Sequence, residues 1–317
     1  MSRIYEALQK AESERGSEPE KRAQQNSVVA VADYDVPLAT VASLEADSRS
    51  SERPGSSAFS PSSEPLLDLS GVPAKSWSPD LRRLPALLER GPAVEQFRSL
   101  RSRIYELRDI KPLKSILISS GMPQEGKSFV ATNLAISLAR NKNAKVLLID
   151  GDMRRYTIHQ LLGCEAEPGL ADFLAGRSTM VEVMQRPEAA SITAAAGMRV
   201  GGLSSLTLIA GGIGGDRAAD LSNNNRFGEL ITAASPHFDW IIIDSSPVLP
   251  VSDAVNLARF CDGVLLVARG GVTEYSDAQR AQHELKSANL LGFVLNAAER
   301  LPKASTYYGY DPRHEGE

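Results

Sequence analysis

The residues with the clearest chemistry in this chain lie in a glycine loop that follows a short apolar segment. Gly121-x4-Gly126-Lys127-Ser128 fits the Walker A pattern of a phosphate-binding loop, and a strand is expected at Ser115–Ser119 directly before it. In such a loop backbone N–H groups turn toward phosphate oxygens, the lysine reaches the β- and γ-phosphates, and the serine hydroxyl ligates Mg²⁺. The N-terminus of the helix expected next adds a favourable dipole. This segment therefore predicts a nucleoside triphosphate site.

Two carboxylates follow the next apolar segment, residues 145–149. Asp150 and Asp152 stand at the expected carboxyl end of that strand, where ligands bind in open parallel sheets. A nucleotide held by a phosphate loop needs a carboxylate near its magnesium and a group that orients or deprotonates the nucleophile. The two aspartates are spaced to divide those tasks, and Arg154 or Arg155 could face the phosphates. The alternative is an ordinary acidic loop that caps the next helix.

A third carboxylate, Asp244, ends the apolar segment Trp240–Ile243 and resembles a Walker B aspartate. Such a group binds magnesium directly or through water, although an aspartate after a strand is also a common turn former. Arg269 and Asn296 end two further apolar segments. Arg269 is a candidate phosphate contact, and Asn296 is a candidate hydrogen-bond partner for an adenine edge.

Alternating apolar strands and helices from Pro92 onward must position these residues. Strands are expected at Ser115–Ser119, Lys145–Ile149, Leu206–Ile209, Trp240–Ile243, Gly263–Ala268 and Gly292–Leu295, and helices at Val94–Leu107, Phe129–Arg140, Arg226–Ala234, Asp253–Arg259 and Tyr275–Ala288. Strands that are apolar almost throughout favour a parallel sheet covered on both faces. The predicted fold is therefore α/β, a P-loop NTPase with a mostly parallel sheet between helices.

The N-terminal part of the chain has a different composition. Residues 1–14 predict an amphipathic helix that is too short to be stable alone in water. Residues 15–83 are rich in Ser, Glu, Pro and Ala, and such a segment predicts a disordered linker. The P-loop domain is then expected over residues 84–300 and a C-terminal tail over 301–317.

Composition narrows the function classes. The net charge of −4 gives no reason to expect a nucleic-acid partner, and no apolar run approaches the roughly 20 residues that cross a bilayer. Residues 1–22 lack the apolar stretch of a secretory signal. The two cysteines are isolated, which favours neither a disulfide framework nor a zinc site. A cytoplasmic protein is expected.

Together these motifs resemble the bacterial tyrosine kinases (BY-kinases) of capsule and exopolysaccharide synthesis, from about residue 95 to the C-terminus. The matching parts are the Walker A loop, the motif Asp150-Gly151-Asp152 and the Walker B segment that ends at Asp244 and continues to Pro247. None of the departures from the family pattern, such as Ser245-Ser246 before that proline, removes a phosphate or metal ligand.

Two further features are similar to that family. Glu95, Arg98 and Arg101 look like its subunit-contact motif, although this spacing also fits a solvated, self-paired helix face. Tyr307, Tyr308 and Tyr310 look like its C-terminal tyrosine cluster, although tail aromatics could also form a docking patch.

The resemblance implies phosphorylation of tail tyrosines on a neighbouring subunit, with ATP and Mg²⁺. Asp152 then looks like the group that accepts the tyrosine hydroxyl proton, a step that a base assists because the phenol pKa is near about 10. The implied metal ligands are Ser128, Asp150 and Asp244. The implied catalytic residues are Lys127, Asp150, Asp152 and Asp244, and the implied nucleotide-binding residues are Gly121, Pro123, Glu125, Gly126, Lys127, Ser128, Phe129, Arg269 and Asn296.

The resemblance also implies partners and a location. Family members form ring-like homo-oligomers and work with a transmembrane polysaccharide co-polymerase (a chain-length determinant), which here would be a separate chain. That partner would recruit the protein to the inner face of the plasma membrane, and the N-terminal helix is a candidate docking element.

Two other classes share these motifs. A ParA/MinD-type ATPase carries a lysine at the second position of the Walker A motif, where this chain has Met122, and lacks a tyrosine-rich tail. A non-catalytic ATP-binding scaffold of the polysaccharide machinery would use the same residues to bind ATP without phosphoryl transfer.

Overall fold

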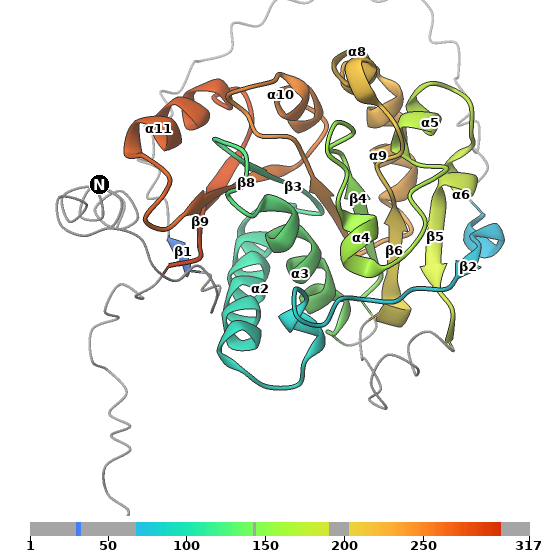
Figure 1. Ribbon diagram of the computed structural model, residues 1–317, viewed down its shortest axis with the longest axis horizontal. Helices are drawn as coiled ribbons and strands as arrows, with labels where there is room; N and C mark the ends of the chain where they lie inside the picture. The colour runs from blue at the N-terminus through green and yellow to red at the C-terminus, as the bar shows by residue number, and fades with distance from the viewer. Residues whose placement is uncertain (1–29, 33–67, 142–143, 190–202, 299–317) are drawn as a thin grey trace, which may run out of the picture.

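The sheet at the centre of the fold contains the apolar segments that the sequence predicts as strands. The computed structural model describes residues 30–32, 68–141, 144–189 and 203–298. In these ranges nine strands follow one another in the order β1-β9-β8-β3-β7-β4-β6-β5-β2 (Figure 1). Their bounds are β1 Ala30–Ala32, β2 Ala74–Lys75, β3 Ser115–Ser120, β4 Val146–Asp150, β5 Met184–Pro187, β6 Leu206–Ile209, β7 Trp240–Asp244, β8 Gly263–Arg269 and β9 Leu290–Asn296.

The six central strands, from β9 to β6, are all parallel to their neighbours. Among the described strands, antiparallel pairing is limited to β1 with β9 and β5 with β6, on either side of this parallel group. The mostly parallel sheet predicted from the sequence is therefore confirmed. Because parallel strands end at the same edge, β3, β4, β7, β8 and β9 bring their carboxyl ends together there.

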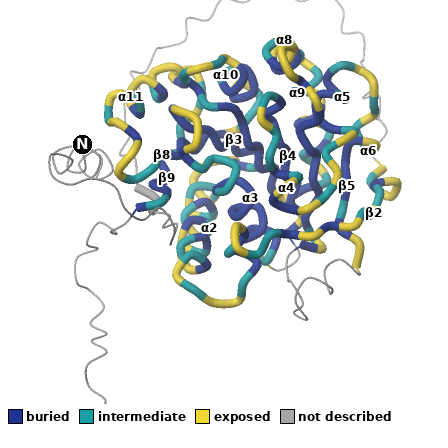
Figure 2. Tube along the Cα trace, viewed as in Figure 1, coloured by how far each residue is buried: buried dark blue, intermediate teal, exposed yellow. Residues whose placement is uncertain are grey.

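Helices cover both faces of the sheet (Figure 1). Ile116 and Ile118 of β3 pack into one core cluster with residues of α2 and α3, whereas Leu117 between them packs into a second cluster with residues of α9, α10 and α11. This alternation follows from the two-residue period of a strand, and Figure 2 shows the strands as the buried centre. The α-helices are α2 Pro92–Ile110, α3 Lys127–Ala139, α4 Ile158–Leu162, α5 Leu170–Leu174, α6 Met180–Val183, α8 Ala218–Ser222, α9 Arg226–Ala234, α10 Asp253–Ala258 and α11 Tyr275–Glu284, and the short 3₁₀ turns are η1 Leu69–Gly71, η2 Pro85–Leu87, η3 Leu203–Ser205 and η4 Gly215–Arg217.

The structure differs from the sequence prediction in the segment assigned to a linker. Residues 68–83 pack against the domain: β2 pairs with β5, and the Trp77 side chain is 2% exposed and donates its indole N–H to Gln185. The three residues of β1 pair with β9 at the opposite edge of the sheet. The physical reason is the large apolar surface of Trp77, which is stabilised by burial despite its polar sequence neighbours.

The helix predicted for residues 1–14 and the tail at 301–317 lie outside the described residues. Among the described helices, none is both long and apolar enough to cross a lipid bilayer.

Candidate active site

The phosphate loop connects β3 to α3 at the carboxyl edge of the sheet. Gly126 has φ +94°, a left-handed conformation that favours glycine, and it directly precedes Lys127 at the start of α3. A Cβ at Gly126 would lie 2.0 Å from the Asn296 side-chain nitrogen. Both the conformation and the space therefore require glycine at this position of the Walker A motif.

Side chains from inside and outside the Walker A motif fix the shape of this loop. The buried Glu125 carboxylate accepts hydrogen bonds from its own loop, at the Met122 backbone N–H (2.8 Å), and from the Thr273 hydroxyl beyond β8. The Asn296 amide at the end of β9 donates to the Glu125 carbonyl oxygen (3.0 Å). Burial raises the pKa of the Glu125 carboxyl, against the lowering effect of the Met122 and Thr273 donors. The loop is thus tied to the neighbouring strand ends before any nucleotide is present.

The three aspartates lie at the carboxyl ends of two adjacent strands. Asp150 of β4 and Asp244 of β7 are register partners, and both side chains are fully buried. Asp152 follows two residues after β4 and is also buried. The pairing of β4 with β7 is therefore what brings together carboxylates that are almost 100 residues apart in the sequence.

Lys127 links the phosphate loop to this acidic group. Its ammonium nitrogen is 3.1 Å from Oδ2 of Asp152. Burial lowers the pKa of Lys127, but the carboxylates of Asp244, Asp152 and Asp150 together raise it above its usual value. The lysine is therefore charged and lies between the loop and the strand-end carboxylates.

Asp150 is committed to the backbone that follows it. One carboxylate oxygen accepts hydrogen bonds from the Thr157 and Ile158 N–H groups (3.0 and 3.1 Å), and the other faces the Asp152 N–H at 3.3 Å. Burial, followed by the neighbouring Asp244 carboxylate, raises the pKa of Asp150 well above its usual value. Asp150 thus shapes the loop that carries Asp152.

Asp244, unlike Asp150, is not tied to the backbone by well-formed hydrogen bonds. Neither of its buried carboxylate oxygens accepts a well-formed hydrogen bond, although the nearby Ser128 hydroxyl and Ser245 N–H lower its pKa. Burial outweighs these effects and the attraction of Lys127, and it raises the pKa of Asp244 to about 7. A buried carboxyl group without such partners is costly, and a cation beside it would remove that cost.

The residues present fit a Mg²⁺ ion that is completed by a nucleotide. Mg²⁺ is usually held by one or two carboxylates together with waters and substrate phosphates rather than by an all-protein cage. Asp244 and the neighbouring Ser128 hydroxyl supply such a partial ligand set. Accordingly, the described part of the chain contains no cluster of three His, Cys, Asp or Glu side chains that could hold a metal alone.

The remaining candidates from the sequence, three arginines and Asn296, lie around the aspartates and have different partners. Arg154 forms an ion pair with Asp253 at the start of α10 (2.7 Å), while the Arg155 side chain is exposed. Arg269 donates to the carbonyl oxygen of Gln124 in the phosphate loop (3.4 Å). Asn296 is buried beside the loop, and its side-chain oxygen has no hydrogen-bond partner.

The predicted subunit-contact residues lie on α2, which packs against α3. Arg98 pairs with Glu95 (2.5 Å), and Arg101 donates to the Ser137 carbonyl oxygen of α3 (2.8 Å). Tyr307, Tyr308 and Tyr310 lie outside the described residues. Of the two remaining nucleotide-binding candidates, Pro123 lies in the phosphate loop and Phe129 lies in the first turn of α3.

Sequence reasoning missed Thr273 and Asp253. Thr273 anchors the phosphate loop through Glu125, and Asp253 anchors the loop after β4 through Arg154. Neither residue stands in a motif, and the contacts join residues that are about 100 or more positions apart. No local signal marked them.

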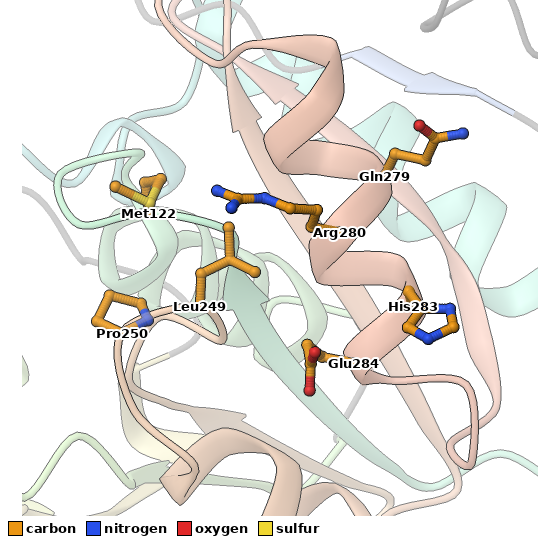
Figure 3. A pocket seen from close by; sticks show the side chains of 7 residues that line it. All are labelled: Met122, Leu249, Pro250, Gln279, Arg280, His283 and Glu284. Atoms are coloured by element: carbon orange, nitrogen blue, oxygen red, sulfur yellow. The ribbon is translucent and has the colours of Figure 1, made fainter.

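A groove of about 790 Å³ borders the phosphate loop on the side of α11 (Figure 3). In Figure 3, Met122 and Arg280 face each other across it, with Leu249 and Pro250 of the loop after β7 beside them. The groove contains none of the three aspartates and does not include Lys127. The chemistry is therefore centred beside this hollow rather than inside it.

Comparisons with known proteins relate this site to others. No family model matches the chain. It is 33% identical over 218 residues to tyrosine-protein kinase YwqD of Bacillus subtilis, a match that covers 68% of this chain and 85% of that protein. It is 32% identical over 210 residues to tyrosine-protein kinase ptk of Acinetobacter johnsonii and 31% identical over 220 residues to tyrosine-protein kinase etk of Escherichia coli. These matches cover 66% and 69% of this chain but little more than a quarter of ptk and etk, 27% and 28% of their lengths.

Solved structures that superpose on this chain include the kinase domain of one of these relatives. The kinase domain of Escherichia coli tyrosine kinase ETK superposes with a TM-score of 0.57 at 30% identity, over 69% of this chain and 80% of that one. The chimerical protein CapA2B2 superposes with a TM-score of 0.60 at 27% identity, over 71% of this chain and 94% of that one. Fold and sequence therefore point to the same group of proteins.

Proposed function

The chain belongs to the bacterial tyrosine-protein kinase family, and we propose that it transfers the γ-phosphoryl group of ATP to tyrosines of its own C-terminal tail. The acceptors are Tyr307, Tyr308 and Tyr310. One observation carries this proposal most directly: the ammonium of Lys127 lies 3.1 Å from the Asp152 carboxylate. The group that would bind phosphate and the group that would accept a proton thus meet in one buried site.

ATP binding is supported by the shape of the phosphate loop. Its left-handed Gly126 and the following N-terminus of α3 turn backbone N–H groups toward the place of an anion. Lys127 adds a positive charge for the β- and γ-phosphates. Arg269 and Asn296 lie beside the loop at the ends of β8 and β9, where Arg269 would contact phosphate and the free Asn296 oxygen would accept a hydrogen bond from the adenine.

Magnesium would be held by Ser128 and Asp244, with Asp150 behind them. When bound, the ion would neutralise charge on the transferred phosphoryl group. This placement is supported by the two Asp244 carboxylate oxygens, which have no hydrogen-bond partners. Asp244 is the register partner of Asp150, whose carboxylate is hydrogen-bonded.

Asp152 would act as the base toward the tyrosine hydroxyl. Its Oδ1 accepts the Arg155 N–H (3.0 Å), and its Oδ2 is engaged by Lys127. Phosphate oxygens would compete for the lysine ammonium, which would free Oδ2 to accept the phenolic proton. A tyrosine would therefore meet an available base only when nucleotide is in place.

The assembly would be a ring-like homo-oligomer in which each tail reaches a neighbouring subunit. Glu95, Arg98 and Arg101 are proposed as the subunit contact from α2. Each phosphorylated tyrosine would add about −1.5 to −2 charge, so the ring would loosen as its tails are filled. Tyrosine-to-phenylalanine and wild-type proteins that keep the same oligomer size with Mg²⁺-ATP would contradict this mechanism.

The proposed process is the synthesis and export of exopolysaccharide or capsule. The partner would be a separate transmembrane co-polymerase that activates the kinase and holds it at the inner face of the plasma membrane, with residues 1–14 as the docking element. Deletion of those residues should abolish recruitment to membranes that contain the partner. Unchanged recruitment would contradict their docking role.

The direct test of the activity is phosphotyrosine detection on purified protein incubated with Mg²⁺-ATP. The wild type should give a signal, and replacement of Tyr307, Tyr308 and Tyr310 by phenylalanine should remove most of it. ATP hydrolysis without phosphotyrosine, even with a co-polymerase tail fragment added, would contradict the proposal.

A further inference from the structure

An ion pair behind the acidic centre joins two segments that flank it. The Arg154 side chain contacts Asp253 through two nitrogens, with Nε at 2.7 Å from Oδ2 and Nη2 at 3.4 Å from Oδ1. The Asp253 side chain is only 2% exposed, whereas that of Arg154 is 31% exposed. A buried carboxylate engaged by two N–H groups on one edge of a guanidinium has a well-defined geometry.

This ion pair helps to attach the loop that carries Asp152, as does the hydrogen bond from the Gly214 N–H to the Met153 carbonyl oxygen (3.3 Å). At its start, the Gly151 N–H donates to the Asp244 carbonyl oxygen at 2.9 Å, and a Cβ at Gly151 would lie 2.6 Å from that oxygen. At its other end, Arg154 attaches the loop to the first turn of α10. Asp152 lies between these two contacts.

The Arg154–Asp253 ion pair also links two neighbouring loops at this edge of the sheet. Helix α10 follows the loop after β7, and β7 is the neighbour of β4 in the sheet. The Arg154–Asp253 pair therefore couples the segment after β4 to the segment after β7, at the same edge where Asp150 and Asp244 are register partners. A loop held in this way has little freedom to move Asp152 away from Lys127.

We propose that Arg154 and Asp253 are positioning residues, whose ion pair holds the Asp152 carboxylate where it accepts the tyrosine proton. This inference rests on the proposed function, because it assumes the role given there to Asp152. Arg154 was a candidate phosphate contact from its place in the sequence, and its pairing with Asp253 gives it a different task. Lysine cannot replace it fully, because a single ammonium lacks the planar fork of the guanidinium.

A double-mutant cycle between Arg154→Lys and Asp152→Asn tests the inference. Arg154→Lys alone should lower kcat for tail phosphorylation by about 10- to 100-fold, because small displacements of a reacting group have effects of that size. Its KM for ATP should change by less than about threefold, since the phosphate loop is untouched. In the Asp152→Asn background the same substitution should cause no further loss, because the group that it positions is no longer a base.

Arg177→Lys is the matched control. Arg177 pairs with Asp172 through Nε and Nη2 at 3.1 and 2.8 Å, and the Arg177 side chain is 49% exposed. This substitution makes the same change of side chain at another arginine–aspartate pair. It should leave both kcat and KM unchanged.

Equal losses of kcat in the wild-type and Asp152→Asn backgrounds would overturn the inference, as would a loss confined to KM. The thermal unfolding midpoint of Arg154→Lys checks the fold, and the neutral pair Arg154→Gln with Asp253→Asn supplies a second variant that leaves no buried charge unpaired. That pair should recover part of the kcat lost on Arg154→Gln alone, and no recovery would also count against the inference. Absence of phosphotyrosine from the wild type would contradict the proposed function instead, and the same cycle measured by ATP hydrolysis would then decide the positioning role.

Discussion

The phosphate loop and the strand-end carboxylates form the two halves of the site, and they are held in opposite ways. Around the loop, most of the polar groups find partners in the protein: Glu125 accepts from Met122 and Thr273, and Asn296 donates to the loop backbone, although its side-chain oxygen has no partner. On the carboxylate side, two acids with raised pKa values lie side by side, and the oxygens of Asp244 lack hydrogen-bond partners. The loop is thus preorganised, whereas the acidic half needs positive charge to be completed.

This difference indicates how the binding of a metal and a nucleotide would act on each half of the site. A preorganised loop needs no rearrangement when it binds phosphate, which favours affinity. An acidic pair without a cation destabilises the folded state, and that destabilisation is relieved only in the loaded enzyme. Lys127 is the residue that belongs to both halves, because it starts α3 and contacts Asp152.

The largest effect is expected at this shared residue. Lys127→Met removes the positive charge between the halves and leaves three buried acids without it, so tail phosphorylation should fall by about 10³-fold, the size typical for loss of a key electrostatic contact. Phosphotyrosine formation against time measures it. A variant with more than a tenth of wild-type activity would show that the two halves do not depend on this lysine.

Asp244→Asn should separate activity from stability. Without a full carboxylate the metal is held less well, and phosphorylation should fall by about 10²-fold. The nucleotide-free variant should nevertheless unfold at a temperature about 2–8 °C higher at pH 8, since it no longer buries an unpartnered charge. A variant that is both inactive and less stable than the wild type would contradict the contrast between the halves.

The pH dependence of stability should also reflect the buried Asp244 carboxyl group. The pKa of Asp244 is about 7 in the folded protein against 3.8 for the free group. The protonated carboxyl group therefore contributes its full stabilisation of the folded state below about pH 4, and this stabilisation is lost as the pH rises to about 7. The gap in melting temperature between Asp244→Asn and the wild type should therefore widen from pH 5 to pH 8. A constant gap over this range, measured without nucleotide, would argue against a raised pKa.

On the loop side, Glu125→Gln should give a smaller effect. The amide keeps the size of the side chain but turns one acceptor into a donor that faces the Thr273 hydroxyl or the Met122 N–H. A weakened anchor of about 1–1.5 kcal/mol should reduce ATP affinity by about tenfold. Thr273→Val is the matched variant, and nucleotide titration of both should give similar losses if they act through the same contact.

The smallest effect is expected for Asn296→Ala. This removes one donor to the loop and one free acceptor, and ATP affinity should fall by about fivefold. GTP affinity, measured in the same titration, should change less than ATP affinity if the Asn296 oxygen reads the adenine. Equal losses for both nucleotides would limit Asn296 to its structural contact with Glu125.

Much of the fold followed from the sequence because its signals are local. Strand β6 and helix α9 have the predicted bounds, β3, β7 and β8 extend one residue further than predicted, and β4 is shifted by one residue. The antiparallel strand β5 and the packed segment at residues 68–83 were missed, because their places depend on contacts with distant residues such as Gln185. The short strand β1 was missed for the same reason.

The site shows the same division. Motif residues such as Gly126 and Asp244 could be found because a phosphate loop and a strand end have sequence patterns. The partners of Arg154 and Glu125 could not, because Asp253 and Thr273 reach them only through the topology of the sheet. Sequence patterns thus identified the chemical groups, while long-range packing determines which of them are already satisfied.

The central claim is that these halves, joined by Lys127, phosphorylate the tail, and mass-spectrometric mapping of phosphate tests it most directly. Purified wild type and Lys127→Met would be incubated with Mg²⁺-ATP and with ATP plus a chelator. The account predicts phosphate on Tyr307, Tyr308 or Tyr310 of the wild type with Mg²⁺-ATP only. Phosphate that persists in Lys127→Met, or a wild type that hydrolyses ATP but leaves these tyrosines unmodified, would contradict it.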